Sequence, residues 1–294
     1  MELAGEMKPK LKILVTGIGA PGTSGTIYAL KNNPDAVEIA TIGTDMRVDA
    51  PGRPLADQFR LVPPPEDDGY VETMIDICVT EGVDVVVPQT TRECAVLSHE
   101  RSRMIEAGVA VLVASAESFR SANNKAVLLD CFSGLGFPTP DYRRAGDEDQ
   151  LRSAAHELGY PEVPVVVKPT DLFGMRGFRV LIENKWDQDR FLGEKPDGAE
   201  TGLDDLILVL STGEQYPDLL VTEFLPGDEY SIDAFVGSRC EIAVSRLRKS
   251  IRTGISVESV VELREDMSGP TLAAAKALGL TLTFGMQFKL VSRL

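Results

Sequence analysis

The fold is decided by one stretch more than any other: VPVVVKPTDLFGMRGFRVLIE, residues 163–183. Its β-branched, apolar residues predict a strand over 163–169, a glycine-containing loop over 171–177 and a second strand over 178–183. Lys168 lies near the end of the first strand, where a lysine can present a point charge to a phosphate. Arg176 and Arg179 follow closely. Taken alone, Lys168 is better explained as an ordinary surface lysine.

Upstream of this stretch, short apolar strands alternate with helices, which predicts βαβ units and a parallel sheet. The expected strands are 11–16, 36–43, 83–88 and 109–114, and the expected helices are 23–32, 70–82 and 91–108. A further helix over 123–136 ends before Pro138, which marks a plausible domain boundary.

Downstream, strands follow one another with short connections, which favours an antiparallel sheet. A helix begins at a capping box formed by Asp147 and Gln150, and residues 194–205 are polar and form a loop. Later strands are expected over 218–225, 228–237, 239–247, 256–263 and 280–290, with a helix from Ser268 to Leu278. The fold class is therefore α/β, with an α+β C-terminal part.

Composition excludes several classes of protein. The 294 residues include 30 Lys plus Arg and 45 Asp plus Glu, a net charge of −15 that disfavours nucleic acid and anionic membranes as partners. No apolar run reaches the ~18–20 residues that span a bilayer, and the N-terminus has no secretory signal. Four scattered cysteines suit a reducing compartment, so we expect a cytoplasmic protein. Two histidines leave little room for a Ser-His-Asp triad.

A glycine motif, Gly17-x-Gly19-x-x-Gly22, lies between the first strand and the first helix. Asp45 follows about twenty residues later, after the second strand, as in a dinucleotide-binding fingerprint. The alternative is a tight strand-to-helix turn that binds no dinucleotide. The absence of any other dehydrogenase feature favours that alternative.

A second motif is TEFLPGDEYSID, residues 222–233. Strand alternation places Glu229, Ser231 and Asp233 on one face, where two acids suit a ribose hydroxyl, a metal or a basic partner. A solvated strand face explains the same pattern.

A basic run follows in this acidic chain, and it contains Arg239, Arg246, Arg248, Lys249 and Arg252. Opposite Lys168 it would form an anion pocket, since a cleft of one sign focuses the field. An equally good explanation is that these basic residues form salt bridges on the protein surface.

Taken in order, these motifs resemble those of the ATP-grasp superfamily, nearest to the carbamoyl-phosphate synthase large-subunit domains and related carboxylate–amine ligases. The resemblance covers residues 11–290 and includes ANNK at 122–125 and GMQFKL at 285–290. It implies an N-terminal pre-ATP-grasp domain over 1–118, a linking helix and lid over 119–192, and an incomplete C-terminal ATP-grasp domain over 193–294.

The resemblance also implies roles for individual residues. Lys125 and Lys168 would hold ATP phosphates, with the loop over 171–177 and Arg176 closing over them. Glu223 and Leu225 would meet adenine. The remaining candidates are Glu229 for ribose, Gln287 for Mg²⁺, and Lys249 and Arg252 as catalytic residues. The implied reaction activates a small-molecule carboxylate with ATP and joins it to an amine.

One departure concerns the metal site. The family follows its QFK strand with a Glu-x-Asn motif that binds Mg²⁺, whereas this sequence continues with VSRL and stops. We therefore expect either an ATP-dependent carboxylate–amine ligase that lacks two expected metal ligands in this chain or a non-catalytic ATP-binding or regulatory subunit. A boundary within a longer protein, a natural truncation and a partner chain that supplies the rest all remain open explanations, as does a homo-oligomer. A Rossmann-type NAD enzyme is the weaker alternative. Glu93 is a weak candidate for the substrate side, and no residue indicates which carboxylate or amine is used.

Overall fold

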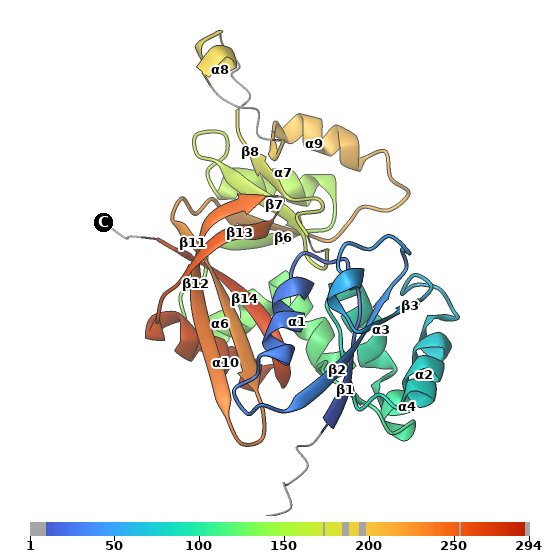
Figure 1. The fold of residues 1–294 in the computed structure, drawn as a ribbon. Helices are drawn as coiled ribbons and strands as arrows, with labels where there is room; N and C mark the ends of the chain where they lie inside the picture. The colour runs from blue at the N-terminus through green and yellow to red at the C-terminus, as the bar shows by residue number, and fades with distance from the viewer. Residues whose placement is uncertain (1–9, 173, 184–187, 194–197, 253, 292–294) are drawn as a thin grey trace, which may run out of the picture. The chain divides into compact units, whose positions relative to one another are not determined.

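The structure is a computed structural model that describes residues 10–172, 174–183, 188–193, 198–252 and 254–291. It divides into two compact units, which are described separately (Figure 1). Unit 1 comprises residues 1–120 and 280–283, and unit 2 comprises residues 121–279 and 284–294.

Unit 1 is built on a parallel five-stranded sheet with the order β3-β2-β1-β4-β5. The predicted parallel sheet is thereby confirmed. One short strand was missed, because its four residues are too few to show a period. The strands are β1 (Lys10–Val15), β2 (Glu38–Asp45), β3 (Gln58–Leu61), which is the missed one, β4 (Val85–Val87) and β5 (Ala110–Val111).

Helices cover both faces of this sheet. On one face, α1 (Thr23–Lys31) packs Ile27 against the side chains of β1. On the other face, α2 (Tyr70–Glu81), α3 (Thr91–His99) and α4 (Arg101–Glu106) bury Met74, Leu97 and Met104 in one core. The single helix expected over 91–108 was wrong, because Glu100 has a non-helical backbone and separates α3 from α4. A one-turn 3₁₀ helix, η1 (Arg53–Leu55), precedes β3.

The helix predicted over 123–136 is confirmed as α6 (Lys125–Gly134), with slightly shorter bounds, and a separate helix that was not predicted, α5 (Ala116–Asn123), precedes it. Helix α5 ends and α6 begins at Asn124, whose backbone is extended. The Asn124 side chain accepts hydrogen bonds from the backbone N–H of Ala126 and Val127, which satisfies donors that a helix start leaves unpaired. Lys125 is thus the first residue of a helix, at a fixed position.

Unit 2 contains two sheets, and the first has the order β6-β10-β7-β8-β9. Its members are β6 (Tyr142–Ala145), β7 (Val165–Pro169), β8 (Arg179–Leu181), β9 (Glu200–Thr201) and β10 (Leu219–Glu223). Strand β10, which was expected in the C-terminal sheet, instead pairs in antiparallel fashion with β6 and β7. Strand β6 was not predicted.

Two helices cover this sheet, and a further short helix is α8 (Gln188–Gly193). Helix α7 (Glu148–Glu157) begins at Asp147, and the predicted capping contact with Gln150 is present. Helix α9 (Leu203–Leu210) begins within the stretch expected to be a polar loop. That expectation was wrong because Leu203, Leu206 and Ile207, spaced for one helical face, enter the same buried core as α7.

The second sheet of unit 2 has the order β13-β12-β11-β14. Its strands are β11 (Asp228–Val236), β12 (Glu241–Arg252), β13 (Ile255–Val261) and β14 (Leu282–Leu290). The β11–β12 and β12–β13 pairs are antiparallel, which confirms the prediction for the C-terminal part. Helix α10 (Glu265–Ala277) and α6 pack against one face through Met267, Ala274 and Phe132.

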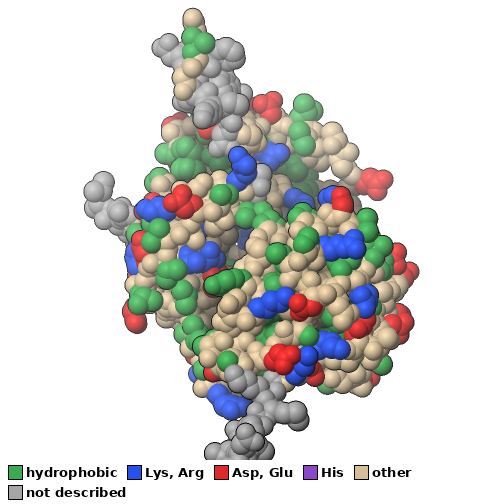
Figure 2. Space-filling view, in the orientation of Figure 1, with side chains coloured by type: hydrophobic (Ala, Val, Ile, Leu, Met, Phe, Trp, Pro, Cys, Tyr) green, Lys and Arg blue, Asp and Glu red, His purple; other side chains and the backbone are tan. Residues whose placement is uncertain are grey.

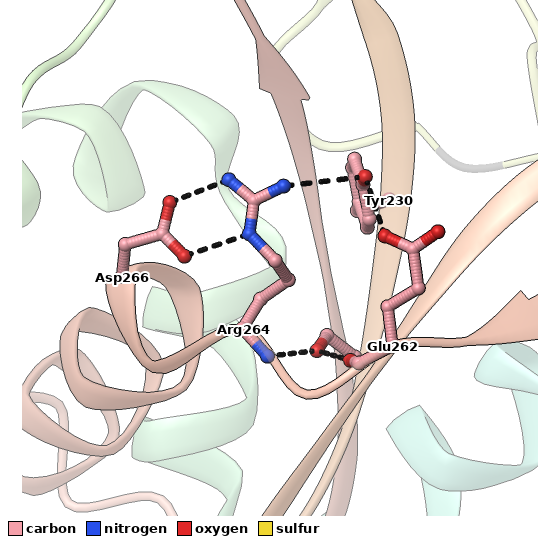
Figure 3. A network of polar contacts seen from close by, with 5 residues as sticks. Tyr230, Glu262, Arg264 and Asp266 are labelled. Atoms are coloured by element: carbon pink, nitrogen blue, oxygen red, sulfur yellow. Dashed lines mark hydrogen bonds and ion pairs between the residues drawn. The ribbon is translucent and has the colours of Figure 1, made fainter.

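A polar network joins this packed face to the start of α10 (Figure 3). The Arg264 guanidinium donates to both carboxylate oxygens of Asp266, at 2.9 and 2.7 Å, and lies 5.3 Å from the centroid of the Tyr230 ring. The Tyr230 hydroxyl donates to Glu262 at 2.9 Å, and Ser245 accepts from the Arg264 backbone N–H. Because successive strand residues point to opposite faces, fixing Tyr230 here directs its neighbour Glu229 to the open face.

The surface carries both charges despite the acidic composition. Lysine and arginine side chains lie next to aspartate and glutamate side chains over the face shown in Figure 2. Among the helices of the described ranges, none combines the length and the hydropathy that crossing a bilayer requires.

Candidate functional site

Lys168 lies on β7, where it is opposite Leu220 of β10. Its neighbours Val167 and Pro169 are buried, and Val165 and Val167 belong to the core shared with α7 and α9. Strand alternation therefore directs Lys168 to the face of the sheet away from those helices. The predicted strand and the position of the lysine near its end are both confirmed.

The environment of Lys168 is unusual for a lysine. Burial, and then the positive charges of Lys125 and Lys289, lower the pKa of Lys168 from 10.5 to about 8, while the Glu229 carboxylate opposes this shift. Three lysines and one carboxylate are thus close enough to interact electrostatically. A partly buried group of like charges is costly without an anion, and such perturbed groups are enriched at functional sites.

Lys125 is held beside the end of β7 by backbone carbonyls. Its Nζ donates to Pro169 O at 3.2 Å and also to Leu172 O, and its backbone N–H donates to Thr170 O at 2.8 Å. Burial lowers the pKa of Lys125, with Asp171 opposing the change. These bonds fix the segment that leads from β7 into the glycine loop.

The glycine loop, residues 171–177, contains several left-handed residues: Gly174 at φ +68°, Met175 at φ +61° and Gly177 at φ +72°. A Cβ on Gly177 would lie 2.6 Å from Pro169 Cγ, so glycine is required both for conformation and for space. Arg176 is exposed on this loop. Phe173 lies outside the described residues.

The expected adenine-binding segment follows β10. Glu223 accepts a hydrogen bond from the backbone N–H of Asp141 at 2.9 Å. The Leu225 carbonyl accepts from Lys289 Nζ at 3.1 Å, and that ammonium lies 5.6 Å from the centroid of the Phe224 ring. The segment is therefore fastened to β6 on one side and to β14 on the other.

Lys289 is a residue that our sequence reasoning missed. The signal was present, because Lys289 lies two residues after Gln287 on β14, and strand alternation places both on one face. The opposite face holds Met286, Phe288 and Leu290 in or against the core. Gln287 and Lys289 are both exposed.

The open face of the second sheet carries Glu229 and Asp233, as predicted, but each is paired. Arg248 forms an ion pair with Glu229, and Arg246 donates to both oxygens of Asp233 at 2.6 and 2.8 Å. Two arginines of the basic run are therefore engaged in cross-strand ion pairs with acids of β11.

The other members of the basic run are exposed. Lys249 is the extra residue of a β-bulge, since Arg248 is opposite Ser259 and Ser250 is opposite Glu258. Arg239 and Arg252 are also on the surface. The catalytic roles of Lys249 and Arg252 remain proposals.

The described residues do not build a magnesium site by themselves. In the described ranges, no group of three His, Cys, Asp or Glu side chains is arranged to hold a metal ion. Mg²⁺ is normally held by one or two carboxylates together with phosphate oxygens. The Glu229 carboxylate is engaged by Arg248, and the Asp233 carboxylate by Arg246.

The glycine motif of unit 1 is a strand-to-helix turn that Asp45 stabilises. Gly17 has φ +49°, and Asp45 Oδ2 accepts from the Gly19 backbone N–H at 2.9 Å. The other Asp45 oxygen accepts from the Arg47 backbone N–H at 3.0 Å. In a dinucleotide-binding site Asp45 would accept hydrogen bonds from the ribose. Here both of its carboxylate oxygens accept hydrogen bonds from nearby backbone N–H groups instead.

Glu93 lies beside the same turn and is buried. It completes a capping box with Thr90 at the start of α3, where its Oε2 accepts from the Thr90 hydroxyl at 2.8 Å. Burial raises the pKa of Glu93, while hydrogen bonds from Thr90 and Thr16 oppose the shift. The capping box accounts for Glu93 without a substrate, and its role toward a substrate stays a prediction.

We expect Thr90→Ala to lower the free energy of unfolding by about 1–2 kcal/mol, because it removes the side-chain cap of α3 and a donor to a buried carboxylate. Urea unfolding followed by circular dichroism measures the effect. Thr212→Ala, at an exposed position, is the control and should change the value by less than about 0.5 kcal/mol. Equal effects of the two substitutions would contradict the capping role.

Two family models match the chain. The model described as "PylC-like, N-terminal domain" matches residues 13–112, and "ATP-grasp in the biosynthetic pathway with Ter operon" matches residues 215–293. The first lies within unit 1 and includes the glycine motif. The second includes the segment after β10, Glu229, the basic run and Gln287.

Curated relatives are large chains of carbamoyl phosphate synthase. The protein of Mycobacterium tuberculosis H37Rv is 31% identical over 83 residues, which are 28% of this chain and 7% of the relative. The protein of Agathobacter rectalis is 24% identical over 227 residues, or 77% of this chain and 18% of the relative. The chain therefore matches less than a fifth of the length of these relatives.

Solved structures share the fold at low sequence identity. An ADP complex of N5-carboxyaminoimidazole ribonucleotide synthetase is 16% identical, with a TM-score of 0.66 over 99% of this chain and 69% of the other. The biotin carboxylase domain of Hydrogenobacter thermophilus 2-oxoglutarate carboxylase, solved with MgADP and bicarbonate, is 16% identical, with a TM-score of 0.68 over 96% and 61%. The chain therefore shares the fold of these ATP-binding proteins, and it is similar to an ATP-grasp family model over residues 215–293 and to the large chain of carbamoyl phosphate synthase over part of its length.

Proposed function

We propose that this protein binds ATP at Lys168 and uses it to activate a small-molecule carboxylate, which is then joined to an amine. The observation that carries the proposal is the group of three lysines around the end of β7, in which Lys168 has a pKa lowered to about 8. The phosphates of a nucleotide would neutralise this charge. ADP and MgADP are bound in two proteins of the same fold.

In this proposal, different residues of unit 2 contact the phosphates, the adenine and the ribose of the nucleotide. Lys168 contacts the phosphates, and Lys125 joins it by exchanging its bond to the Leu172 carbonyl for a phosphate oxygen. The glycine loop, residues 171–177, covers the phosphates with Arg176. The backbone of Glu223–Leu225 contacts adenine, and Glu229 accepts hydrogen bonds from the ribose hydroxyls.

The chemistry suits a site with cations and no histidine. A carboxylate oxygen of the substrate attacks the γ-phosphorus, the bond to ADP breaks, and an acyl-phosphate forms; the amine then displaces phosphate and loses a proton. Such phosphoryl transfer depends on positioning and charge neutralisation more than on a protein nucleophile. We assign Lys249 and Arg252 to the anionic groups that develop in these steps.

Mg²⁺ would enter with the nucleotide and neutralise phosphate charge. Gln287 is the residue that we propose beside it. Since the described residues gather no carboxylate set for the ion, we assign no step of the reaction to it.

Calorimetric titration with ATP and Mg²⁺, followed by an assay of ADP release with a panel of carboxylates and amines, tests the proposal. Micromolar ATP binding and carboxylate-dependent ADP release are expected. ATP binding without ADP release for any pair would favour a non-catalytic ATP-binding subunit. NAD binding in place of ATP binding would overturn the assignment.

The affinity for ATP should depend on pH in a defined direction. In the free protein Lys168, with its pKa lowered to about 8, is charged below that pH and neutral above it. Affinity should therefore be flat from about pH 6.5 to about pH 7.5 and fall by up to about tenfold per unit above pH 8. Titrations at constant ionic strength measure this. Lys168→Arg, which stays charged, is the control, and an equal fall in that variant would contradict the role of Lys168.

A further inference from the structure

Arg248 is a charged residue that the structure buries almost completely. Its side chain is only 3% exposed, although it lies on β12 among exposed residues of the basic run. Arginine is rarely buried unless its donors are used, because desolvation of the charge is costly. Its partners therefore indicate what the burial achieves.

Each nitrogen of the Arg248 guanidinium has a partner on a different segment. Nη1 pairs with Glu229 on β11, and Nε donates to the Ser256 hydroxyl on β13 at 2.7 Å. Nη2 donates to the Gly254 carbonyl, in the turn between β12 and β13, at 2.5 Å. One planar group thus holds three segments in a fixed relation, which a flexible lysine ammonium could not reproduce.

The turn that Arg248 holds contacts the glycine loop. A Cβ on Gly254 would lie 2.8 Å from Cγ of Met175 and 3.3 Å from its sulfur atom, so the Met175 side chain packs directly on this turn. Gly254 has φ +80°, which glycine adopts without strain. A continuous series of contacts therefore leads from the Glu229 carboxylate through Arg248 to the loop over 171–177.

We propose that Arg248 is a positioning residue for nucleotide binding, which orients the Glu229 carboxylate toward the sugar hydroxyls and fixes the turn on which the glycine loop rests. This inference rests on the proposed ATP binding at Lys168. The Arg248 contact occupies one oxygen of Glu229, and the second oxygen can accept from a hydroxyl. The role is indirect, since Arg248 itself contacts neither sugar nor phosphate.

The chain supplies a matched control two residues away. Arg246 is on the same strand and the same face, and it also pairs with an acid of β11, namely Asp233. Its remaining contact is the Ser259 hydroxyl at 3.3 Å, and no contact of Arg246 with the β12–β13 turn is found among the described residues. Arg246→Met therefore breaks a comparable cross-strand pair without touching the route to the glycine loop.

The test compares ATP with 2′,3′-dideoxy-ATP, which lacks both sugar hydroxyls. Wild type should bind ATP on the order of 10–100-fold more tightly, the effect of a hydrogen bond to a charged group. In Arg248→Met this ratio should fall to about 1–3, as in Glu229→Gln, whereas Arg246→Met should keep the wild-type ratio. A merely structural role would weaken both nucleotides equally and leave the ratio unchanged.

Two further measurements keep the test decisive if Arg248→Met folds poorly. Arg248→Lys retains the charge and should show an intermediate ratio. Hydrogen exchange of the nucleotide-free proteins should be faster over 171–177 and 251–256 in the Arg248 variants than in wild type and Arg246→Met.

The outcomes separate this inference from the proposed function. A wild-type ratio in both Arg248 variants, or an equal loss in Arg246→Met, would overturn the positioning role. Equal binding of the two nucleotides by wild type would also overturn it, while ATP binding at Lys168 would stand. A wild-type protein that binds neither nucleotide would overturn the proposed function together with the sugar-binding part of this inference, and the exchange rates would then decide whether Arg248 anchors the turn.

Discussion

Replacing Lys168 with methionine should lower the affinity for ATP by about 10²–10³-fold and raise the melting temperature of the protein. The loss of affinity follows because methionine fills the space of the lysine stem but offers no charge to a phosphate. The gain in stability follows because the folded state holds the Lys168 ammonium partly buried beside Lys125 and Lys289. A residue that lowers the stability of the folded protein but is needed for binding is typical of a functional site.

The size and pH range of the stability gain follow from linkage. Folding lowers the pKa of Lys168 from 10.5 to about 8, so the folded state binds this proton less tightly than the unfolded state. The cost is fully present below about pH 8 and disappears as the pH rises toward 10.5. We expect a gain of about 2–3 kcal/mol at pH 7, or several degrees in melting temperature.

Calorimetric titration and thermal unfolding of the same preparations test both effects. Lys276→Met, at an exposed lysine of α10, is the control and should change neither quantity appreciably. Unchanged ATP affinity in Lys168→Met would refute the proposed site. A lower melting temperature would show that the surroundings of Lys168 stabilise its charged form, and it would contradict the destabilising effect of burial beside Lys125 and Lys289.

Gly227→Ala should destabilise the protein by about 3 kcal/mol and lower the affinity for ATP by about tenfold or more. A Cβ at this position would lie 1.5 Å from the Leu290 carbonyl oxygen and 2.6 Å from its carbonyl carbon. Both are backbone atoms, which no rotamer change can move aside. The end of β14 must therefore separate from the segment after β10, and with it Lys289 from the Leu225 carbonyl.

Gly25→Ala is the matched control, because a Cβ there meets nothing within 4 Å and the residue lies inside α1. Alanine stabilises a helix relative to glycine, so this variant should gain about 0.5–1 kcal/mol. Urea unfolding and ATP titration of both variants give the comparison. A Gly227 variant as stable as wild type would show that β14 does not rest on this segment.

Much of the fold could be predicted because local pattern and tertiary structure agree. The alternating strands and helices of 11–118 and the strand–loop–strand unit over 163–183 are apolar runs bounded by glycine or proline, and such signals need no distant partner. The predictions failed where a contact with residues distant in the sequence determines the secondary structure or the strand pairing. Helix α9 forms in a stretch that looks like a loop because three of its residues reach the core of α7. Strand β10 pairs with β6 and β7, and local pattern could not predict this because both partners precede β10 by many residues.

At the candidate site, too, residues in local motifs could be predicted, whereas contacts between distant residues could not. Lys125, Lys168 and Glu229 were recognised from motifs, and the electrostatic effect of Lys125 and Glu229 on Lys168 shows that the fold brings them together. Lys289 and the pairing of Arg248 with Glu229 were missed, because a charged residue in a strand reveals its partner only when the register of neighbouring strands is known.

The sequence by itself determined the alternation of strands and helices over 11–118, the parallel class of the N-terminal sheet, the antiparallel pairing in the C-terminal part and the position of Lys168 near the end of a strand. These properties depend on side-chain period and on residue type, which are local. Only the tertiary structure decided that Arg248 is buried against Glu229, that Asp45 serves the glycine turn and that Lys289 fastens β14 to the segment after β10. Hydrogen bonds and ion pairs require atoms within about 3 Å, and residues far apart in the chain meet at that distance only after it has folded.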